Sequence, residues 1–99
     1  MDLAKNARFA RGTELIVACY IYVLGTRDRR APRTYVGWTT DLDERLARHN
    51  AGKGAKATRG REWILLYAER FKTRSAAMSR EWHLKRDKGF RKALRSIAH

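Results

Sequence analysis

The first long apolar run of the chain spans residues 15–24 and lies between two glycines. It is rich in β-branched and aromatic residues, and its length suits a strand that is buried on at least one face. Because side chains alternate along a strand, Tyr22 and Leu24 are expected on one face. Ile21 and Val23 are expected on the other face, so this strand should contribute to two packing surfaces.

A second strand is predicted over residues 33–39, after a loop at 25–32 that is rich in Arg and Asp. Tyr35 and Gly37 are expected on the same side of this strand. If the two strands pair antiparallel, Tyr22 and Tyr35 can approach one another. The pattern therefore predicts two phenol groups that come from different strands and lie close together.

A helix is predicted over residues 41–50. Thr40 or Asp41 is a suitable N-cap, and the glutamate three residues after Asp41 completes a start that resembles a capping box. On a helical wheel, two leucines form the apolar stripe of this helix. Arg45 and His49 fall beside that stripe rather than on the opposite face, so both polar groups are expected at the edge of the core.

The stretch 52–60 contains three glycines and is predicted to be a flexible basic loop with no helix or strand of any length. The apolar run 63–68 is the third strand candidate. It is apolar enough to be a central strand or to be covered on both faces.

Two further helices are expected, at 75–87 and from about residue 90 to 97. The last one should pack on the core through apolar side chains at helical spacing, including Phe90, Leu94 and Ile97. Together the strands and helices predict one domain of the α/β class, in its α+β form, over residues 15–99. Residues 1–14 are interpreted as an N-terminal extension.

The chain has 99 residues, which is enough for one domain with a modest core and too few for two. Its 23 Lys and Arg against 10 Asp and Glu give a formal net charge of +13. So strong a positive field favours polyanionic partners. A hydrophobic content of 43% excludes a disordered basic tail, so the charge is expected on the surface of a folded domain.

The single cysteine, Cys19, lies in the first apolar run and is expected to be a small buried hydrophobe. No intramolecular disulfide can form, so a reducing, cytoplasmic location is predicted. The longest apolar run is well below the ~20 residues that a membrane helix needs, so no membrane association is predicted. Residues 1–13 lack the pattern of a cleaved export signal.

Glu81 falls on the inward face of the helix at 75–87. Burying an unpaired carboxylate costs several kcal/mol, so this group must be protonated, paired with a cation or bound to a metal ion. From its position alone a salt bridge is the simpler explanation. Beside two tyrosines and Arg45, a divalent metal ion becomes the better one. His83 is two positions away and should point away from this carboxylate.

Hydrolysis of a phosphodiester bond gives each of these residues a task. Tyr22 and Tyr35 can handle the proton of the attacking water, although a phenol with a pKa of about 10 needs nearby cations or a metal-bound water to act as a base. Arg45 can neutralise phosphate oxygens, or pair with Asp41 or Glu44 instead. His49 can bind a phosphate, relay a proton or cap its helix. Which tyrosine takes the proton is left open.

Four cations in and just after the glycine-rich loop are expected to contact a nucleic-acid backbone: Lys53, Lys56, Arg59 and Arg61. A solvated basic loop without a ligand is the alternative. A triphosphate-binding loop is rejected, because the stretch does not follow a strand and its Gly-Lys pair precedes Gly rather than Ser or Thr. No cluster of Cys and His has the spacing of a zinc site.

Two tripeptides, followed in order by an arginine, a histidine and a glutamate, resemble the GIY-YIG nuclease superfamily. The matching residues are Tyr20-Ile21-Tyr22, Tyr35-Val36-Gly37, Arg45, His49 and Glu81. The similarity extends from residue 17 to about 97 and is greatest to small stand-alone members of the UPF0213 type, related to Slx-type and excision-repair nuclease domains. The segment 52–59 also looks like that of the small members.

The resemblance implies a central three-stranded antiparallel sheet flanked by helices, and an endonuclease that hydrolyses phosphodiester bonds in DNA. It also implies one divalent ion, Mg²⁺ or Mn²⁺, on Glu81, a tyrosine that assists the attacking water and an arginine that stabilises the transition state. Products would carry 5′-phosphate and 3′-hydroxyl ends. A nucleic-acid-binding module with the same fold and no catalysis is the alternative, and the net charge supports it equally well.

The chain departs from the family at two positions. Tyr20 stands where glycine is usual, and Trp38 stands where several relatives carry a polar or basic residue. Two large rings near the site favour stacking on unpaired bases, so single-stranded or branched DNA is the expected substrate, with RNA as the alternative. A protein partner could supply targeting, because the chain carries no sequence-reading domain of its own.

Overall fold

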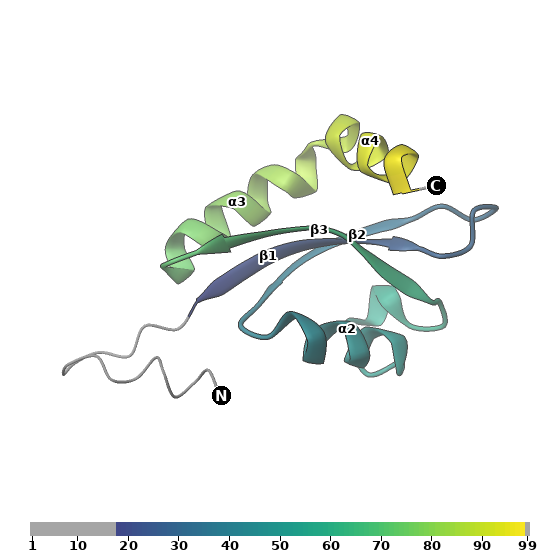
Figure 1. Ribbon diagram of the computed structural model, residues 1–99, viewed down its shortest axis with the longest axis horizontal. Helices are drawn as coiled ribbons and strands as arrows, with labels where there is room; N and C mark the ends of the chain where they lie inside the picture. Colours follow the sequence, from purple (N-terminus) through teal and green to yellow (C-terminus); the bar gives the residue numbers. More distant parts are fainter. Residues whose placement is uncertain (1–17, 99) are drawn as a thin grey trace.

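The computed structural model describes residues 18–98 as three strands and four helical segments (Figure 1). In chain order these are β1 (Cys19–Thr26), β2 (Thr34–Thr39), α2 (Leu42–Asn50), the short 3₁₀ helix η1 (Lys56–Thr58), β3 (Trp63–Phe71), α3 (Arg74–Arg86) and α4 (Lys88–Ala98). The strands form one antiparallel sheet in the order β2-β1-β3. The prediction of a three-stranded antiparallel sheet flanked by helices is confirmed. The predicted extension at 1–14, and the predicted strand residues 15–17, lie outside the described residues.

The sheet has a hydrophobic core on each face. α2 covers one face, and α3 and α4 cover the other (Figure 1). On the α3 side, alternate residues of β1 pack with two residues of α3: Ile21, Val23, Ala77 and Leu84. On the α2 side, the other alternate residues of β1 pack with the start of β3: Tyr22, Leu24 and Trp63. The predicted division of β1 into two faces is confirmed, and the tyrosine face is the one that α2 covers.

The register between β1 and β2 decides which side chains meet under α2. Tyr22 is opposite Gly37, and Leu24 is opposite Tyr35. Tyr22 and Tyr35 are therefore diagonal neighbours on one face, which is within reach of aromatic side chains. Their ring centroids lie 6.4 Å apart. The prediction that the two phenol-bearing side chains approach one another is confirmed.

β3 lies at the edge of the sheet, so the suggestion of a central position is wrong. β1 is the central strand and pairs with β2 along one edge and with β3 along the other. β3 extends over Trp63–Phe71, three residues beyond the predicted end at residue 68. A register shift between Val23 and Leu24 leaves Leu66 as the extra residue of a bulge. Helices on both faces of the sheet contact β3. β3 is therefore apolar because helices pack against both of its faces, although the side chain of Leu65 remains exposed.

α2 is fixed at both ends. At its start, the Asp41 carboxylate accepts a hydrogen bond from the main-chain N–H of Glu44 at 3.1 Å, which confirms the predicted N-cap. At its end, the Asn50 amide donates to the Trp63 carbonyl at 3.1 Å and accepts from the Trp63 N–H at 2.7 Å. The helix is therefore held against the sheet, and the face that carries His49 is turned toward the tyrosines.

α4 packs on the core through Phe90 and Leu94. The prediction that Ile97 also packs there is wrong, because this side chain is 83% exposed. Hydrogen bonds from the preceding turn of α4 reach Thr26, which is the last residue of β1. Ile97 lies two residues beyond Arg95, which makes these contacts, and its side chain faces solvent.

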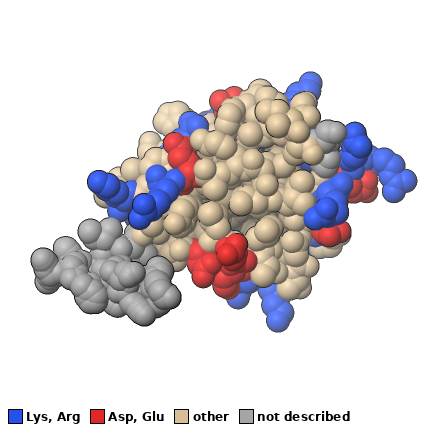
Figure 2. Space-filling view, in the orientation of Figure 1, with Lys and Arg blue, Asp and Glu red and all other residues tan. Residues whose placement is uncertain are grey.

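Charged side chains are unevenly distributed over the surface. In the view of Figure 2, Lys and Arg lie around the rim, and the middle of the face is largely uncharged. A group of cations lies at the end of the molecule where Figure 1 shows the β1–β2 loop and α4. Between residues 18 and 98, no helix is both long enough and apolar enough to span a membrane.

Candidate active site

The hydroxyl of Tyr22 occupies the space that Gly37 leaves by having no side chain. A Cβ built on Gly37 would lie 2.6 Å from the Tyr22 Oη and 3.0 Å from the ring of Tyr35. Tyr22 is only 2% exposed, whereas Tyr35 is half-buried on the edge strand β2. The glycine of the second tripeptide therefore allows the two aromatic side chains to share one face of the sheet.

A chain of hydrogen bonds runs from Tyr22 into the core. The Tyr22 Oη lies 2.8 Å from His49 Nε2, and His49 Nδ1 lies 2.8 Å from Thr58 Oγ1. The Thr58 hydroxyl donates its hydrogen to the carbonyl of Ala55 at 2.8 Å. A hydroxyl has one hydrogen, so Thr58 must accept from His49 Nδ1–H. We therefore assign the Nδ1–H tautomer, in which His49 Nε2 accepts the hydrogen of the Tyr22 hydroxyl.

The segment after α2 holds the imidazole in place. A Cβ built on Gly54 would lie 2.5 Å from His49 Nδ1, so the main chain approaches the ring as only glycine allows. Thr58 lies in η1 and is fully buried, and its carbonyl accepts a hydrogen bond from Trp63 Nε1 at 2.8 Å. The prediction of a loop without regular structure is wrong over residues 56–58, because these contacts stabilise one 3₁₀ turn.

Burial and charge fix the protonation states of this pair. Burial, followed by the Tyr35 phenol, raises the pKa of Tyr22 well above its ordinary value, while Arg45 opposes the rise and Glu81 adds to it. Burial, followed by the positive charge of Arg45, lowers the pKa of His49 below its ordinary 6.5. At neutral pH a neutral phenol therefore donates to a neutral imidazole, and the imidazole is the proton acceptor of the pair.

Within the described part of the chain, Arg45 has no acidic partner. Glu44 pairs with Arg48 at 3.8 Å, and Asp41 caps the helix, so neither holds this guanidinium. The Arg45 Nε is buried and has no hydrogen-bond partner among residues 18–98. An unsatisfied buried donor costs about 1–3 kcal/mol, and such groups in native proteins call for a functional explanation. An anionic ligand that reached this donor would satisfy it.

Glu81 faces inward from α3, as predicted, with 18% of its side chain exposed. Its carboxylate lies 3.4 Å from the Nζ of Lys85, whose side chain is 53% exposed. Because Lys85 is largely in solvent, an i,i+4 pair of this kind contributes little, about 0.3–1 kcal/mol. The half-buried carboxylate of Glu69 is different, because it accepts from Arg80 at 2.9 Å and from the Tyr67 hydroxyl at 3.2 Å. The Glu69 carboxylate thus has two hydrogen-bond donors, whereas the described partner of the Glu81 carboxylate is one largely exposed lysine.

The surroundings of Glu81 fit a divalent ion of the magnesium type. Its charge makes the smallest of the four contributions to the pKa shift of Tyr22, and α3 covers the face of the sheet opposite the tyrosine pair. Among residues 18–98, no three His, Cys, Asp or Glu side chains gather as a ligand set. Mg²⁺ commonly binds one or two carboxylates together with waters and substrate phosphates, and a single glutamate meets that requirement.

Two residues with predicted roles lie apart from this cluster. Trp38 is on the other face of β2, half-buried against the α3-side core, with the Arg74 guanidinium 4.7 Å from its ring centroid. The structure does not bring it together with the tyrosine pair. His83 is exposed and its Nδ1 lies 2.9 Å from the Ser79 carbonyl, so it points away from Glu81, as predicted.

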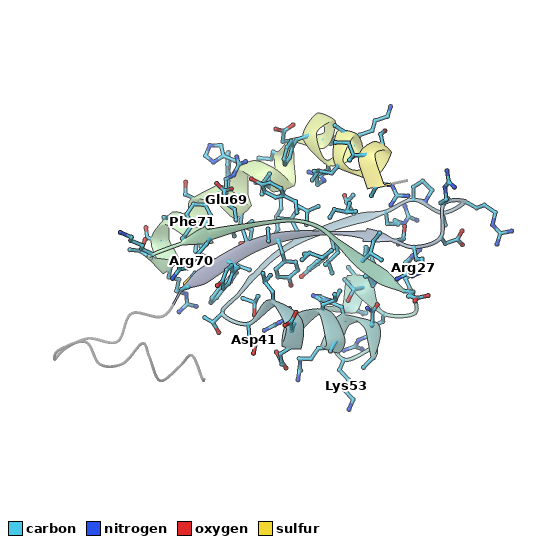
Figure 3. The ribbon with its side chains drawn as sticks, viewed as in Figure 1. Arg27, Asp41, Lys53, Glu69, Arg70 and Phe71 are labelled. Carbon is cyan, nitrogen blue, oxygen red and sulfur yellow. The ribbon has the colours of Figure 1, made fainter. Side chains whose placement is uncertain are left out.

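The cations predicted to bind nucleic acid surround the segment after α2. Lys53, Lys56 and Arg59 are exposed, and Arg61 is half-buried. Lys53 extends away from the sheet, below α2 in the view of Figure 3. These side chains are available to a ligand on that side of the molecule, and their role as backbone contacts stays a prediction.

Gly54 and Thr58 contribute to the site and were missed by sequence reasoning. Thr58 is nine positions from His49, and no helical or strand period relates the two residues. Gly54 was interpreted only as a source of flexibility, whereas it makes close contact with a ring. The sequence did show that segment 52–59 is similar to the small family members. That similarity indicates that these residues matter, but it does not show what they contact.

Comparison with known proteins identifies the family. The family model of the GIY-YIG catalytic domain matches residues 18–93. A UPF0213 protein of Streptococcus pyogenes serotype M5 is 50% identical over 80 residues, which cover 80% of this chain and 84% of that protein. A UPF0213 protein of Natronomonas pharaonis is 48% identical over 67 residues, covering 67% of this chain and 75% of that protein.

A solved structure is also similar. The solution NMR structure of a UPF0213 protein from Bacillus halodurans is 35% identical, covers 81% of this chain and 84% of its own, and has a TM-score of 0.47. Nucleases with a GIY-YIG domain act on nucleic acids and generally depend on a divalent metal ion. The family match and the relatives agree on one assignment: the chain belongs to the GIY-YIG nuclease family, among its small UPF0213 members.

Proposed function

We propose that the protein is a divalent-metal-dependent endonuclease that hydrolyses phosphodiester bonds in DNA. The observation that carries this proposal is the buried hydrogen bond from Tyr22 to a neutral His49, beside the unsatisfied Arg45. The Tyr22 hydroxyl can accept a proton from water only if it gives up its own hydrogen. A neutral His49 Nε2 at hydrogen-bond distance is positioned to take that hydrogen. The resemblance of the motifs to a nuclease family supports the same conclusion.

The proposed reaction moves one proton along the Tyr22–His49 pair. The attacking water gives a proton to the Tyr22 oxygen while the phenol hydrogen passes to His49 Nε2. The water oxygen forms a bond to phosphorus, the bond from phosphorus to the 3′-oxygen breaks, and that oxygen takes a proton from solvent. The imidazolium then returns its proton to solvent. Because the phenol is both acceptor and donor, its high pKa does not prevent it from acting at neutral pH.

Arg45 and Glu81 serve the phosphate in this proposal. The buried Nε of Arg45 would donate to a non-bridging oxygen, where negative charge grows in the transition state. Glu81 would hold the Mg²⁺ or Mn²⁺ ion, which supplies Lewis-acid stabilisation of the phosphate when bound. Tyr35 is half-buried on the rim of the site and would orient the water.

We infer that the substrate is single-stranded or branched DNA. Tyr20 is half-buried on the same face of β1 as Tyr22, so a ring is present next to the site where the GIY-YIG motif usually has glycine. Stacking of a base on such a ring requires that the base is unpaired. Lys53, Lys56 and Arg59 would contact the backbone on the side of η1.

The test is incubation of the protein with end-labelled single-stranded, branched and fully paired DNA, with Mg²⁺, with Mn²⁺ or with chelator. The proposal expects metal-dependent products, with branched or single-stranded DNA cut faster than duplex. Equal rates on duplex would contradict the substrate class. Binding with steep salt dependence and no cutting under any metal condition would support the alternative, a module that binds nucleic acid without catalysis.

Thr58 is expected to be a positioning residue for His49. Replacing it with Val removes the acceptor of Nδ1–H, so the imidazole can take the tautomer that donates to Tyr22. We expect kcat to fall about 10–100-fold with KM unchanged, as when the partner of a functional histidine is lost. Thr58→Ser keeps the hydroxyl and should retain most of the activity in the same cleavage assay. Equal losses in both variants, with unchanged thermal stability, would contradict this role.

The cleavage rate should depend on the charge of His49. This residue must be neutral to accept the proton, and burial together with Arg45 lowers its pKa below 6.5. The rate is therefore expected to be level above pH 6.5 and to fall tenfold per pH unit below the lowered pKa. In Arg45→Met one cause of the lowering is gone, so the acidic limb should move to higher pH. A profile that already falls between pH 8 and pH 7 in the wild type would contradict a neutral His49.

A further inference from the structure

A groove of about 430 Å³ lies between the β1–β2 loop and α4, outside the catalytic cluster. Its lining includes six cationic side chains and no acidic one: Arg29, Arg33, Lys88, Arg91, Lys92 and Arg95. The remaining lining residues are Pro32, Thr34 and Ser96. This is the end of the molecule where Lys and Arg gather in Figure 2. The groove is referred to below as the α4 groove.

Four of the six cations come from one side of α4. Positions 88, 91, 92 and 95 follow the i, i+3, i+4, i+7 spacing of a single helix face. At ~1.5 Å per residue, the first and last lie about 10 Å apart along the helix axis. One strand of DNA rises about 3.4 Å per nucleotide, so this row matches about three successive nucleotides. A row of charges of this length suits a repeating polyanion better than a single small anion.

Arg91 joins the two walls of the groove. Its Nε donates to Thr34 Oγ1 at 3.0 Å, and its Nη1 donates to the carbonyls of Leu84 and Lys85. These acceptors belong to the start of β2 and the end of α3. All three are uncharged, so the guanidinium is held in position while its positive charge is not neutralised.

Arg95 has the same arrangement one turn later. Its Nη1 donates to Thr26 Oγ1 at 3.3 Å and to the Arg33 carbonyl at 3.2 Å. These contacts connect α4 to the β1–β2 loop across 62 and 69 positions of sequence. Two of the six cations of the groove are thus held in position by hydrogen bonds that join α4 to the β1–β2 loop and to the end of α3.

We propose that the α4 groove binds the sugar-phosphate backbone of the DNA substrate, at a surface separate from the Tyr22–His49 pair. The groove lies on the face of the sheet that α3 and α4 cover, opposite the Tyr22–His49 pair. It is connected to Glu81 through α3, because Arg91 binds the carbonyl of Lys85, the ion-pair partner of Glu81. This deepens the proposed function by assigning a second contact surface to the same substrate, but it does not depend on catalysis.

The test uses a pair of exposed lysines in the groove and a matched control pair. Lys88→Gln/Lys92→Gln removes two charges from the groove. Arg70→Gln/Lys72→Gln removes two exposed charges at the end of β3, and Figure 3 shows Arg70 at the end of the molecule opposite Arg27. Binding of fluorescent single-stranded DNA is measured in chelator, so that nothing is cut, across a series of salt concentrations. Equal thermal unfolding midpoints verify that both variants fold.

The groove variant is expected to bind at least tenfold more weakly than the control at ~0.1 M salt, with a salt slope lower by about 1.4, since each lost contact to a single strand removes about 0.7. The same loss in both variants would show a response to net charge only and would overturn the proposal. Failure of the wild-type protein to bind DNA, or groove-dependent binding to anionic lipid vesicles instead, would overturn it too. If the wild-type protein cuts no DNA but the groove variant still binds DNA more weakly than the control, the proposed catalysis is wrong and the proposed DNA-binding groove is supported.

Discussion

Glu81→Gln is expected to lower the single-turnover cleavage rate by at least ~10³-fold while leaving DNA affinity in chelator within about twofold. A bound metal ion stabilises phosphoryl transition states by several kcal/mol, and about 4 kcal/mol corresponds to a factor of ~10³. Gln keeps the size of the side chain and removes the charge, so the fold should persist. The measurement is quenched-flow cleavage with Mg²⁺ titrated over a wide range.

Lys85→Gln is the matched control for this experiment. Lys85 is the described ion-pair partner of Glu81 and is 53% exposed, so the pair contributes at most about 1 kcal/mol to stability. If Glu81 serves only to hold Lys85, both substitutions should have similar small effects. If the Glu81→Gln variant cuts at the wild-type rate, the proposal that Glu81 binds a catalytic metal ion is wrong.

Tyr22→Phe is expected to reduce cleavage by about 10²–10⁴-fold, the range for loss of general acid-base catalysis. The substitution deletes the atom that is proposed to receive the proton from water, and it leaves His49 Nε2 without its hydrogen-bond donor. That unsatisfied acceptor should also destabilise the fold by about 1–3 kcal/mol, measured by urea unfolding. The cleavage assay must therefore be run well below the unfolding midpoint of the variant.

Tyr35→Phe separates the two phenols. Tyr35 is half-buried, and its ring centroid lies 5.1 Å from that of His49, but the hydrogen bond to the imidazole is made by Tyr22. The Tyr35 variant should keep more activity than the Tyr22 variant and should retain the acidic limb of the pH profile. The reverse order of activities would assign the proton transfer to Tyr35.

The parts of the fold that local chemistry determines could be predicted from the sequence. Alternation along β1 placed Tyr22 and Ile21 on opposite faces, and both are found there. Asp41 was recognisable as an N-cap because its partner is only three residues away. Glu81 was predicted to face inward from the helical period alone. In each case the determining interaction lies within one strand or one helical turn.

The remaining features depend on contacts between distant segments. β3 is an edge strand because β2 pairs with one edge of β1 and β3 pairs with the other. The sequence of β3 alone does not indicate this pairing. The exposure of Ile97 depends on how α4 packs against the sheet. The α4 groove combines residues more than fifty positions apart. Such features require the tertiary structure, because no period or local motif relates their parts.

The active site shows both situations. Tyr22 and Tyr35 were expected to meet, and the register confirms it. Spacing could not show whether Arg45 pairs with an acid. The structure pairs Glu44 with Arg48 and gives Arg45 no acidic partner among residues 18–98, so its service to a ligand stays a prediction. The direction of the hydrogen bond to His49 depends on a threonine in a loop, which only coordinates reveal.

The most direct test of the account is single-turnover cleavage of DNA in ¹⁸O-labelled water, with the products analysed by mass spectrometry. The account predicts a 5′-phosphate that carries one solvent oxygen, formed by the wild-type protein with Mg²⁺ and formed at least ~10²-fold more slowly by Tyr22→Phe. A covalent adduct between a tyrosine and DNA would contradict water as the nucleophile. Absence of product from the wild-type protein with every metal ion and substrate would contradict the hydrolytic function itself.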